Sequence, residues 1–332
     1  MKKIINRPED YTDDMLRGIY LAYPHQVKYA VGDLRCYCTA KKIPGKVAIV
    51  TGGGTGHLPL FLGYVGEGLL DGCGVGGVFQ SPAPEQIYEI SKEVEAGAGV
   101  LYLYGNYTGD IMTFDMAADM CELDGIRICS IVGADDVNSA PKDRADSRRG
   151  IAGIFFMYKA AGAKAASMGT LEEVLAAAQK AKDATRTVGF ALTPCTIPEI
   201  GSPNFALAEN EMAMGMGIHG EPGVWTGPLK SADEIVDEML QTILDDMPLS
   251  PGDEVCVLLN GLGATPVDEL YILNSSLYAR LEALGIGVYR TFVGEFATSM
   301  EMAGASLSLC RMDQELKEYI DYPVHTPFYT QI

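Results

Sequence analysis

The feature that most constrains this sequence is an alternation between short apolar runs and longer amphipathic stretches. The apolar runs have the length of strands. Turn residues follow them and lead into stretches where apolar residues recur at three- and four-residue spacing. Strand, turn and helix in that order predict an α/β protein with mainly parallel sheets. The candidate strands are residues 47–51, 100–104, 126–132, 187–192, 254–259, 287–292 and 306–310.

The chain has 332 residues, a length that suits two globular units. Helices are predicted at 111–123, 171–182 and 267–284, and Ser231 followed by Glu234 has capping-box spacing ahead of a helix at 235–244. The alanine-rich helix near residue 180 gives way to a short polar stretch before a new strand begins. We therefore predict two α/β domains, 1–186 and 187–332, with a ligand site at loop ends near the cleft between them.

Composition narrows the possible partners. Hydrophobic residues make up 48% of the chain and charged residues 21%, a balance typical of a globular protein. With 25 Lys and Arg against 44 Asp and Glu, the net charge of -19 disfavours nucleic acid and membrane surfaces as partners. No stretch has the length of a signal-peptide core or of a spanning helix, so we expect a cytoplasmic protein.

Cysteine and histidine usage argues against a metal centre. The eight cysteines are scattered along the chain and are interpreted as buried thiols rather than a disulfide framework. The one close pair, Cys36 and Cys38, lacks the spacing of a CxxC motif, and only four histidines are present. We therefore expect no bound metal.

A glycine-rich segment, residues 52–57 (Gly-Gly-Gly-Thr-Gly-His), follows the predicted strand 47–51 as a turn. Four glycines in five positions let backbone N–H groups face a ligand without intervening side chains. The segment lacks the Lys-Ser/Thr ending of a P-loop, and the third glycine of a dinucleotide fingerprint would fall on His57. We predict a ligand-binding loop that is not evidently a nucleotide site, with a merely tight turn as the alternative.

A second glycine cluster, residues 72–77, matches the letters of the dinucleotide fingerprint. It follows no clear strand and runs into Val-Phe-Gln-Ser-Pro rather than a helix. The structural context that gives the fingerprint its meaning is therefore missing, and this segment is predicted to be a loop.

Asp110 ends the segment Asn-Tyr-Thr-Gly-Asp that follows strand 100–104 and precedes a predicted helix. Ligand sites in α/β proteins lie at the carboxyl ends of parallel strands, so Asp110 is a candidate site residue. Aspartate is also a favoured helix N-cap, and both interpretations stay open. Asp135 and Asp136 follow another strand, but nothing converges on them, and they are interpreted as solvated loop acids or caps.

His219 lies in a glycine-rich stretch, residues 214–223. Small neighbours leave its imidazole accessible, and neutral imidazole has a nucleophilic nitrogen that can add to a carbonyl or relay a proton. One carboxylate and two histidines at loop edges would suffice to bind and deprotonate a small polyhydroxy compound. His25 and His325 lack such surroundings and are interpreted as structural.

Together these segments resemble the substrate-binding (K) subunit of dihydroxyacetone kinases, of the bacterial type linked to the phosphotransferase system. The resemblance covers nearly the whole chain, and its specificity comes from several motifs in consistent order rather than from any single one. The matching motifs are residues 1–6, 52–57, 81–84, 106–110, 148–150, 209–223, 262–265 and 323–327.

The resemblance implies a glycerone kinase subunit that captures a short ketose as a covalent hemiaminal on the imidazole of His219. It implies three catalytic residues, His57, Asp110 and His219, with Asp110 accepting the proton of the hydroxyl that is phosphorylated. The residues implied to bind the substrate are Gly54, Thr55, Gly56, His57 and Asp110.

The resemblance also implies partners. Family members are homodimers that bind no cofactor themselves. ADP or ATP with Mg²⁺ lies on an all-helical nucleotide-binding subunit, which in many bacteria is rephosphorylated by a phosphohistidine carrier of the phosphotransferase system. The chain is therefore expected to be active only with that partner subunit.

Two positions depart from the family pattern. Leu58 stands where the family commonly has Glu, and Gly105 stands where bacterial kinase subunits carry a Lys near the substrate. Loss of the lysine removes a cation and opens space, so a four-carbon sugar such as erythrulose is an alternative substrate. Two further interpretations stay open: a non-catalytic paralogue that binds dihydroxyacetone and switches on a transcription activator, and an α/β protein that binds another small metabolite.

Overall fold

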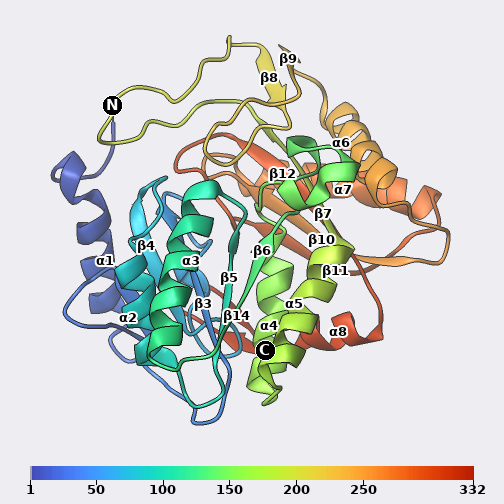
Figure 1. Ribbon diagram of the computed structural model, residues 1–332. Helices are drawn as coiled ribbons and strands as arrows, with labels where there is room; N and C mark the ends of the chain where they lie inside the picture. Colours follow the sequence, from blue (N-terminus) through green and yellow to red (C-terminus); the bar gives the residue numbers. More distant parts are fainter. Residues whose placement is uncertain (1) are drawn as a thin grey trace.

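The computed structural model describes residues 2–332 and folds them into two six-stranded sheets with helices on both faces of each (Figure 1). Met1, with which the predicted first domain begins, lies outside the described residues. The α-helices are α1 (Tyr11–Ala22), α2 (Pro84–Val94), α3 (Thr108–Leu123), α4 (Ile154–Ala166), α5 (Leu171–Ala184), α6 (Ala232–Asp246), α7 (Val267–Ala283) and α8 (Gln314–Asp321). Short 3-10 helices are η1 (Pro8–Asp10), η2 (Leu62–Tyr64), η3 (Val137–Ser139) and η4 (Lys142–Ser147). Across residues 2–332 no helix has both the length and the apolar character needed to span a bilayer.

The first sheet has the strand order β1-β2-β4-β3-β5-β6. Its central and last strands are parallel, since β3 pairs in parallel with β4 and β5, and β5 with β6, whereas β2 is antiparallel to both neighbours. The strands are β1 (Val27–Tyr29), β2 (Cys36–Thr39), β3 (Ala48–Thr55), β4 (Gly72–Val78), β5 (Val100–Gly105) and β6 (Ile128–Gly133).

Two glycine segments that the sequence placed in turns or loops are strands in this sheet. Strand β3 continues through Thr55, and the cluster at 72–77 forms β4. A Cβ on Gly72 would lie 2.3 Å from Ile90 of α2, and one on Gly74 would lie 2.3 Å from Ile87. Because glycine has no side chain, α2 packs directly on the sheet at these positions. The sequence did not predict either segment as a strand because glycine has a low strand propensity.

The second sheet has the order β11-β10-β12-β7-β8-β9 and is mainly antiparallel. Only β10 and β11, which α7 connects, pair in parallel. The expectation of mainly parallel sheets is therefore wrong here, because β12 inserts between β10 and β7 in the opposite direction. The strands are β7 (Thr185–Ala191), β8 (Glu211–Met214), β9 (Trp225–Pro228), β10 (Glu254–Gly261), β11 (Gly287–Gly294) and β12 (Gly304–Arg311), with a separate hairpin of β13 (Val324–His325) and β14 (Thr330–Gln331).

Local predictions from apolar periodicity are otherwise confirmed. All seven predicted strands are present, and the predicted helices correspond to α3, α5, α6 and α7. Ser231 is the N-cap of α6, and it exchanges hydrogen bonds with Glu234 as a capping box. All eight cysteines are free thiols, and Cys129 alone among them is not fully buried.

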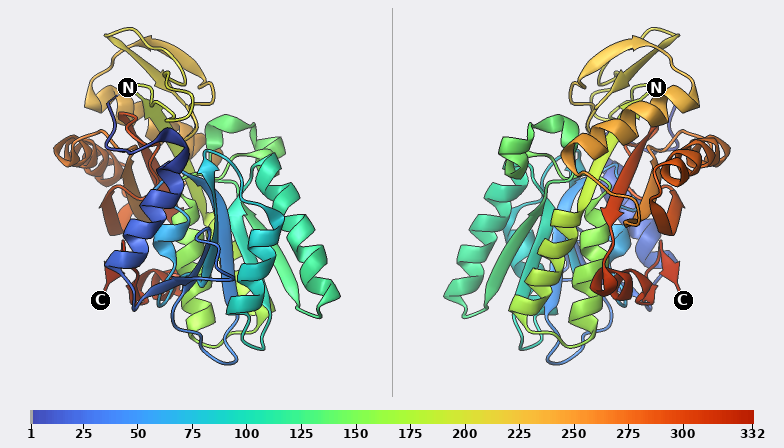
Figure 2. Two further views of the ribbon diagram at one scale, coloured as in Figure 1. Left: turned by 90° about the vertical axis from the view of Figure 1, so that its left-hand side faces the viewer. Right: turned by 90° about the vertical axis from the view of Figure 1, so that its right-hand side faces the viewer.

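One layer of helices lies between the two sheets (Figure 2). The side chains of strand β10 alternate between the two faces of the second sheet. On one face Cys256 and Leu258 pack with Phe155 of α4 in the core between the sheets. On the other face Val255 and Val257 pack with α6 and α7. Helices α2 and α3 cover the outer face of the first sheet. The chain passes from the first sheet to the second between β6 and β7, and the division at residue 186 stays a prediction as a domain boundary.

A buried ion pair ties the loop before α4 to the second sheet. Arg148 donates two hydrogen bonds to Asp246 at the end of α6, with N···O distances of 2.9 and 2.6 Å, and Arg186 of β7 bonds the same carboxylate. The hydrogen bonds from Arg148 outweigh the effect of burial and lower the pKa of Asp246 to about 2. The carboxylate therefore stays ionised as the shared acceptor of two arginines.

Asp246→Ala is expected to lower the free energy of unfolding by about 3–5 kcal/mol, because it leaves the buried guanidinium of Arg148 without its partner. Urea denaturation followed by circular dichroism measures this loss. Asp233→Ala, which removes an exposed partner of Arg280, is the control and should cost less than about 1 kcal/mol. A loss of the same size in both variants would contradict a structural role for Asp246.

Candidate active site

The structure brings His57, Asp110 and His219 together. His57 and Asp110 lie at the carboxyl ends of the parallel strands β3 and β5, as the sequence predicts for Asp110, whereas β8, which precedes His219, is antiparallel to both of its neighbours. His57 follows β3, Asp110 lies in the first turn of α3 after β5, and His219 lies in the loop after β8. The rings of His57 and His219 meet edge to face with centroids 4.8 Å apart. Asp110 is near enough to His219 for a charge on the imidazole to lower the pKa of the Asp110 carboxyl.

His57 is buried and presents a hydrogen-bond acceptor. Its Nδ1 lies 2.7 Å from the carbonyl oxygen of Thr298, and because a carbonyl only accepts, Nδ1 carries the proton. Nε2 is therefore the unprotonated nitrogen, and it has no partner among the described residues. Burial, reinforced by the charge of His219, lowers the pKa of His57 to about 3, so the ring stays neutral.

His219 is oriented by Glu221, two residues further along the same loop. Its Nδ1 lies 2.9 Å from Glu221 Oε1, and its backbone N–H donates to Oε2 at 2.9 Å. Burial opposes ionisation of Glu221, but the hydrogen bond and charge of His219 and the charge of Arg149 lower the pKa of that carboxyl to about 2. Glu221 is therefore an ionised acceptor that holds the proton on Nδ1, and the lone pair of Nε2 is available for a nucleophilic attack.

Asp110 does not cap α3. Tyr107 occupies the N-cap position and Asp110 is the third helical residue, so the capping interpretation is wrong. The carboxyl is 5% exposed, and its Oδ1 has no partner within residues 2–332. Burial raises the pKa of Asp110 to about 6, although a hydrogen bond from Ser81 and the charge of His219 oppose the rise. A carboxyl with this pKa suits a general base near neutral pH.

Asp135 and Asp136 are buried rather than solvated. Asp135 accepts the backbone N–H groups of Ile151 and Gly153, at 2.9 and 2.8 Å, where the chain enters α4. Asp136 caps η3 and forms an ion pair with Arg149. The capping interpretation is thus confirmed for Asp136 but not for Asp135, which is the N-cap of no helix, and the interpretation of both residues as solvated loop acids is wrong.

The glycine segment 52–57 leaves room for the ring of Phe79 to stack on His57. A Cβ on Gly54 would lie 2.7 Å from the Cα of Phe79, and one on Gly56, whose φ is 102°, would lie 2.7 Å from the Phe79 ring. That ring stacks on His57 with centroids 4.7 Å apart. The hydroxyl of Thr55 bonds a threonine of α1. Direct substrate contacts of Gly54, Thr55 and Gly56 stay a prediction.

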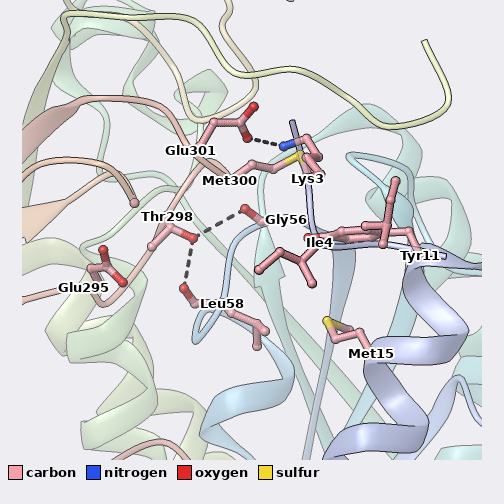
Figure 3. A pocket seen from close by; sticks show the side chains of 12 residues that line it. Lys3, Ile4, Tyr11, Met15, Gly56, Leu58, Glu295, Thr298, Met300 and Glu301 are labelled. Atoms are coloured by element: carbon pink, nitrogen blue, oxygen red, sulfur yellow. Dashed lines mark hydrogen bonds and ion pairs between the residues drawn. The ribbon is translucent and has the colours of Figure 1, made fainter. Parts of the chain in front are cut away.

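Leu58 lines a pocket of about 450 Å³ between the N-terminal segment and the loop after β11, and His57, Asp110 and His219 are not among the residues that line it (Figure 3). Ile4 and Met15 form the apolar side of that pocket, and a hydrogen bond between Lys3 and Glu301 lies across its upper edge. The departure from the family pattern at Leu58 therefore lies outside the set of residues around His219.

The space beside Gly105 is filled by a tyrosine. A Cβ on Gly105 would lie 3.0 Å from the ring of Tyr107, and that ring meets His219 edge to face with centroids 4.8 Å apart. The position is therefore not the open space that the missing lysine suggested. Burial, together with the charge of Glu221, raises the pKa of Tyr107, so its hydroxyl keeps its proton.

Sequence reasoning missed four side chains of the site: Phe79, Tyr107, Arg149 and Glu221. Glu221 carried a usable signal, because a carboxylate two residues after a candidate histidine can reach its ring nitrogen. Tyr107 and Arg149 lie in the family motifs 106–110 and 148–150, which marked their segments but not their roles. Phe79 carried no signal, since its role depends on contacts with residues distant in the sequence.

The site concentrates buried polar atoms that lack partners. Within residues 2–332 six buried side-chain N or O atoms make no hydrogen bond, and three belong to residues grouped around His219: His57 Nε2, Tyr107 Oη and Asp110 Oδ1. Such atoms each cost about 1–3 kcal/mol and are rare in folded proteins. Their grouping favours a small polar ligand that bonds to them. Across the same residues no cluster of three or more His, Cys, Asp or Glu is placed to hold a metal ion.

The chain is similar to known proteins over its whole length. A family model described as the Dak1 domain matches residues 17–328. A dihydroxyacetone-binding subunit of PTS-dependent dihydroxyacetone kinase 2 from Listeria innocua is 41% identical over 330 residues, which cover 99% of both chains. D-erythrulose kinase from Mycolicibacterium smegmatis is 39% identical over 99% of this chain, which spans 56% of that longer protein. Among solved structures, the dihydroxyacetone kinase operon co-activator Dha-DhaQ has a TM-score of 0.90 at 30% identity and covers 96% of this chain and 98% of its own.

Asp110→Asn is expected to stabilise the folded chain at pH 8 by up to about 3 kcal/mol, because burial penalises the ionised carboxyl. The pKa is raised on folding, so the penalty is complete above about pH 6 and absent below about pH 4, where the carboxyl is protonated in both states. Urea unfolding at pH 8 and at pH 4 measures the difference. Asp115→Asn, an exposed position on the same helix, is the control, and equal effects of the two variants at pH 8 would contradict the assignment.

Proposed function

Because the chain belongs to the Dak1 family and is a dihydroxyacetone-binding subunit of a dihydroxyacetone kinase, we propose that its site captures a short ketose covalently on His219 and activates a ketose hydroxyl with Asp110. One observation carries the proposal. Three buried polar atoms that find no partner in the described chain surround a histidine whose Nε2 lone pair is free. A ketose with two hydroxyls supplies both the electrophilic carbon and the hydrogen-bonding groups that match them.

Capture begins with the lone pair of His219 Nε2. It forms a bond to the carbonyl carbon while the π electron pair moves on to the oxygen, which takes a proton from solvent to give the hemiaminal. Nδ1 keeps its proton, so the ring becomes positively charged and the carboxylate of Glu221, 2.9 Å away, stabilises it. A polyol such as glycerol has no carbonyl carbon and cannot form this bond.

His57 and Asp110 then act on the hydroxyls of the captured sugar. His57 Nε2 accepts a hydrogen bond from one hydroxyl and holds the chain of the sugar in place. Asp110, with a pKa of about 6, is ionised at neutral pH and accepts the proton of the hydroxyl that attacks the phosphoryl donor. The two roles differ because the imidazole stays neutral whereas the carboxylate can gain a proton.

The phosphoryl donor in this proposal is ADP or ATP with Mg²⁺ on a helical partner subunit. A phosphohistidine carrier of the phosphotransferase system recharges the nucleotide there, in the cytoplasm. Two observations support this arrangement: the relative from Listeria innocua is PTS-dependent, and this sequence carries no P-loop of its own. The chain is therefore expected to turn over only with that partner.

The co-activator Dha-DhaQ keeps the same fold, so a binding role without catalysis is the second candidate function. The environment of Asp110 favours the enzyme. A ligand sensor gains nothing from a buried carboxyl whose pKa is raised toward neutrality, whereas a general base does. Tyr107 fills the space beside Gly105, which favours dihydroxyacetone over a four-carbon sugar.

The purified chain, mixed with a matching helical subunit and its phosphate donor, is expected to phosphorylate dihydroxyacetone, as measured by product formation coupled to glycerol-3-phosphate dehydrogenase. His219→Ala should abolish covalent capture, which carbon-13 NMR of dihydroxyacetone labelled at its carbonyl carbon detects as a tetrahedral carbon signal. Asp110→Asn should lose at least about a hundredfold in kcat and keep that signal. Phosphorylation of erythrulose alone would reassign the substrate, and capture without any turnover would indicate the co-activator role.

We also propose that the chain forms a homodimer through α7 and the edge strand β11. Tyr271 and Tyr278 are exposed on α7, and β11 is hydrogen-bonded only to β10 within the described chain. An exposed edge strand of this length tends to pair with another strand unless another element covers it.

Light scattering is expected to give twice the mass of one chain, and the double variant Tyr271→Glu with Tyr278→Glu should give monomers. Met116→Glu, at an exposed position on α3, should leave the dimer intact. A monomeric wild-type chain at micromolar concentration would refute the proposal.

A further inference from the structure

A chain of charged side chains leads from the interior to His219. Arg149 donates from Nε to Asp136 Oδ2 at 2.9 Å, and its second terminal nitrogen lies 2.8 Å from the same oxygen. The remaining terminal nitrogen lies 3.7 Å from Glu221 Oε2. Glu221 in turn holds the ring of His219. None of the first three side chains is more than 28% exposed, so water screens these charges only weakly.

The backbone is shaped to let these groups meet. A Cβ on Gly217 would lie 2.1 Å from Glu221 Oε2 and 2.5 Å from a terminal nitrogen of Arg149, so only glycine leaves room for the contact. The carbonyl oxygen of Arg149 accepts the N–H of Asp136, and its own N–H donates to the hydroxyl of Ser139 at 2.9 Å. Arg149 is thus held by its main chain as well as by its guanidinium.

Arg149 is the cation that faces the carboxylate of Glu221 from outside the loop of His219. The other titratable groups that face this cluster are Tyr107, His57, Asp135 and His219 itself. Without Arg149, the carboxylates of Glu221 and Asp136 would face each other with only His219 to balance them. Glu221 would then take up a proton more readily and would also lose one of the contacts that fix its orientation.

We propose that Arg149, held by Asp136, is a positioning residue for covalent capture, a role that rests on the proposed function of His219. It keeps Glu221 ionised and aimed at His219 Nδ1, so that Nε2 presents its lone pair to the carbonyl carbon. When the N–C bond forms and the ring becomes positively charged, the carboxylate is already in place to stabilise it. Arg149 touches neither the substrate nor the reacting atoms.

The test compares capture by the wild-type chain and by Arg149→Met, using carbon-13 NMR of dihydroxyacetone labelled at its carbonyl carbon. The concentration that gives half of the maximal tetrahedral signal is expected to rise about tenfold or more, the effect of losing one charged supporting contact. The signal should also be lost at a higher pH as acid is added, because without the cation of Arg149 the carboxylate of Glu221 stabilises the protonated ring of His219 more strongly, and a protonated Nε2 cannot attack. A purely structural role would leave this pH profile unchanged.

Three further variants keep the test falsifiable. Arg149→Lys retains the charge and should recover part of the affinity and the wild-type pH profile. Asp136→Asn combined with Arg149→Met removes the buried carboxylate that the single variant leaves unpaired, so it should fold well yet still capture weakly. Arg280→Met removes an arginine that pairs with two carboxylates far from the site, and it should leave capture unchanged.

The outcomes separate the two proposals. If the wild-type chain gives no tetrahedral signal, covalent capture itself is wrong. If the wild-type chain gives the signal and the folded double variant matches it in both affinity and pH profile, capture stands and the positioning role of Arg149 is refuted. Weaker capture that Arg149→Lys partly restores supports the positioning role.

Discussion

The hydrogen bond between His219 Nδ1 and Glu221 is the interaction on which the rest of the site depends. An imidazole can add to a carbonyl only through an unprotonated nitrogen that faces the substrate, and an ionised carboxylate at Nδ1 determines which nitrogen that is. In the proposed capture, the same contact places a negative charge beside the ring that becomes positive. Arg149 and Asp136 extend this arrangement into the interior, where low polarity strengthens each charge pair.

The remaining parts of the site act through burial. His57 and Asp110 are both buried, and burial favours the neutral form of each side chain. It therefore lowers the pKa of His57 and raises the pKa of Asp110. A neutral His57 is a reliable acceptor, whereas a carboxyl with a raised pKa is a better base near neutrality. The cost is stability, since three buried polar atoms around His219 have no hydrogen-bond partner in the described chain.

Local regularities could be predicted from the sequence because they depend on neighbours along the chain. The apolar runs located seven strands, and the capping box at Ser231 located the start of α6. The glycine-rich strand β4 was not predicted, because its packing depends on Ile87 and Ile90 of α2. These two side chains fill the space that side chains on β4 would occupy. The direction of β12 escaped notice for a similar reason, since strand direction is set by sheet neighbours that lie far away in the sequence.

The α/β class, the two candidate histidines and Asp110 follow from the amino-acid order, because residue type and local spacing suffice to recognise a strand end or an imidazole among glycines. Only the folded chain establishes that these three residues meet, that Asp110 is buried rather than a cap, and that Tyr107 occupies the space beside Gly105. The physical reason is that a pKa, an unpaired atom or a filled space depends on which distant groups surround a residue, and only the packed chain brings those groups together.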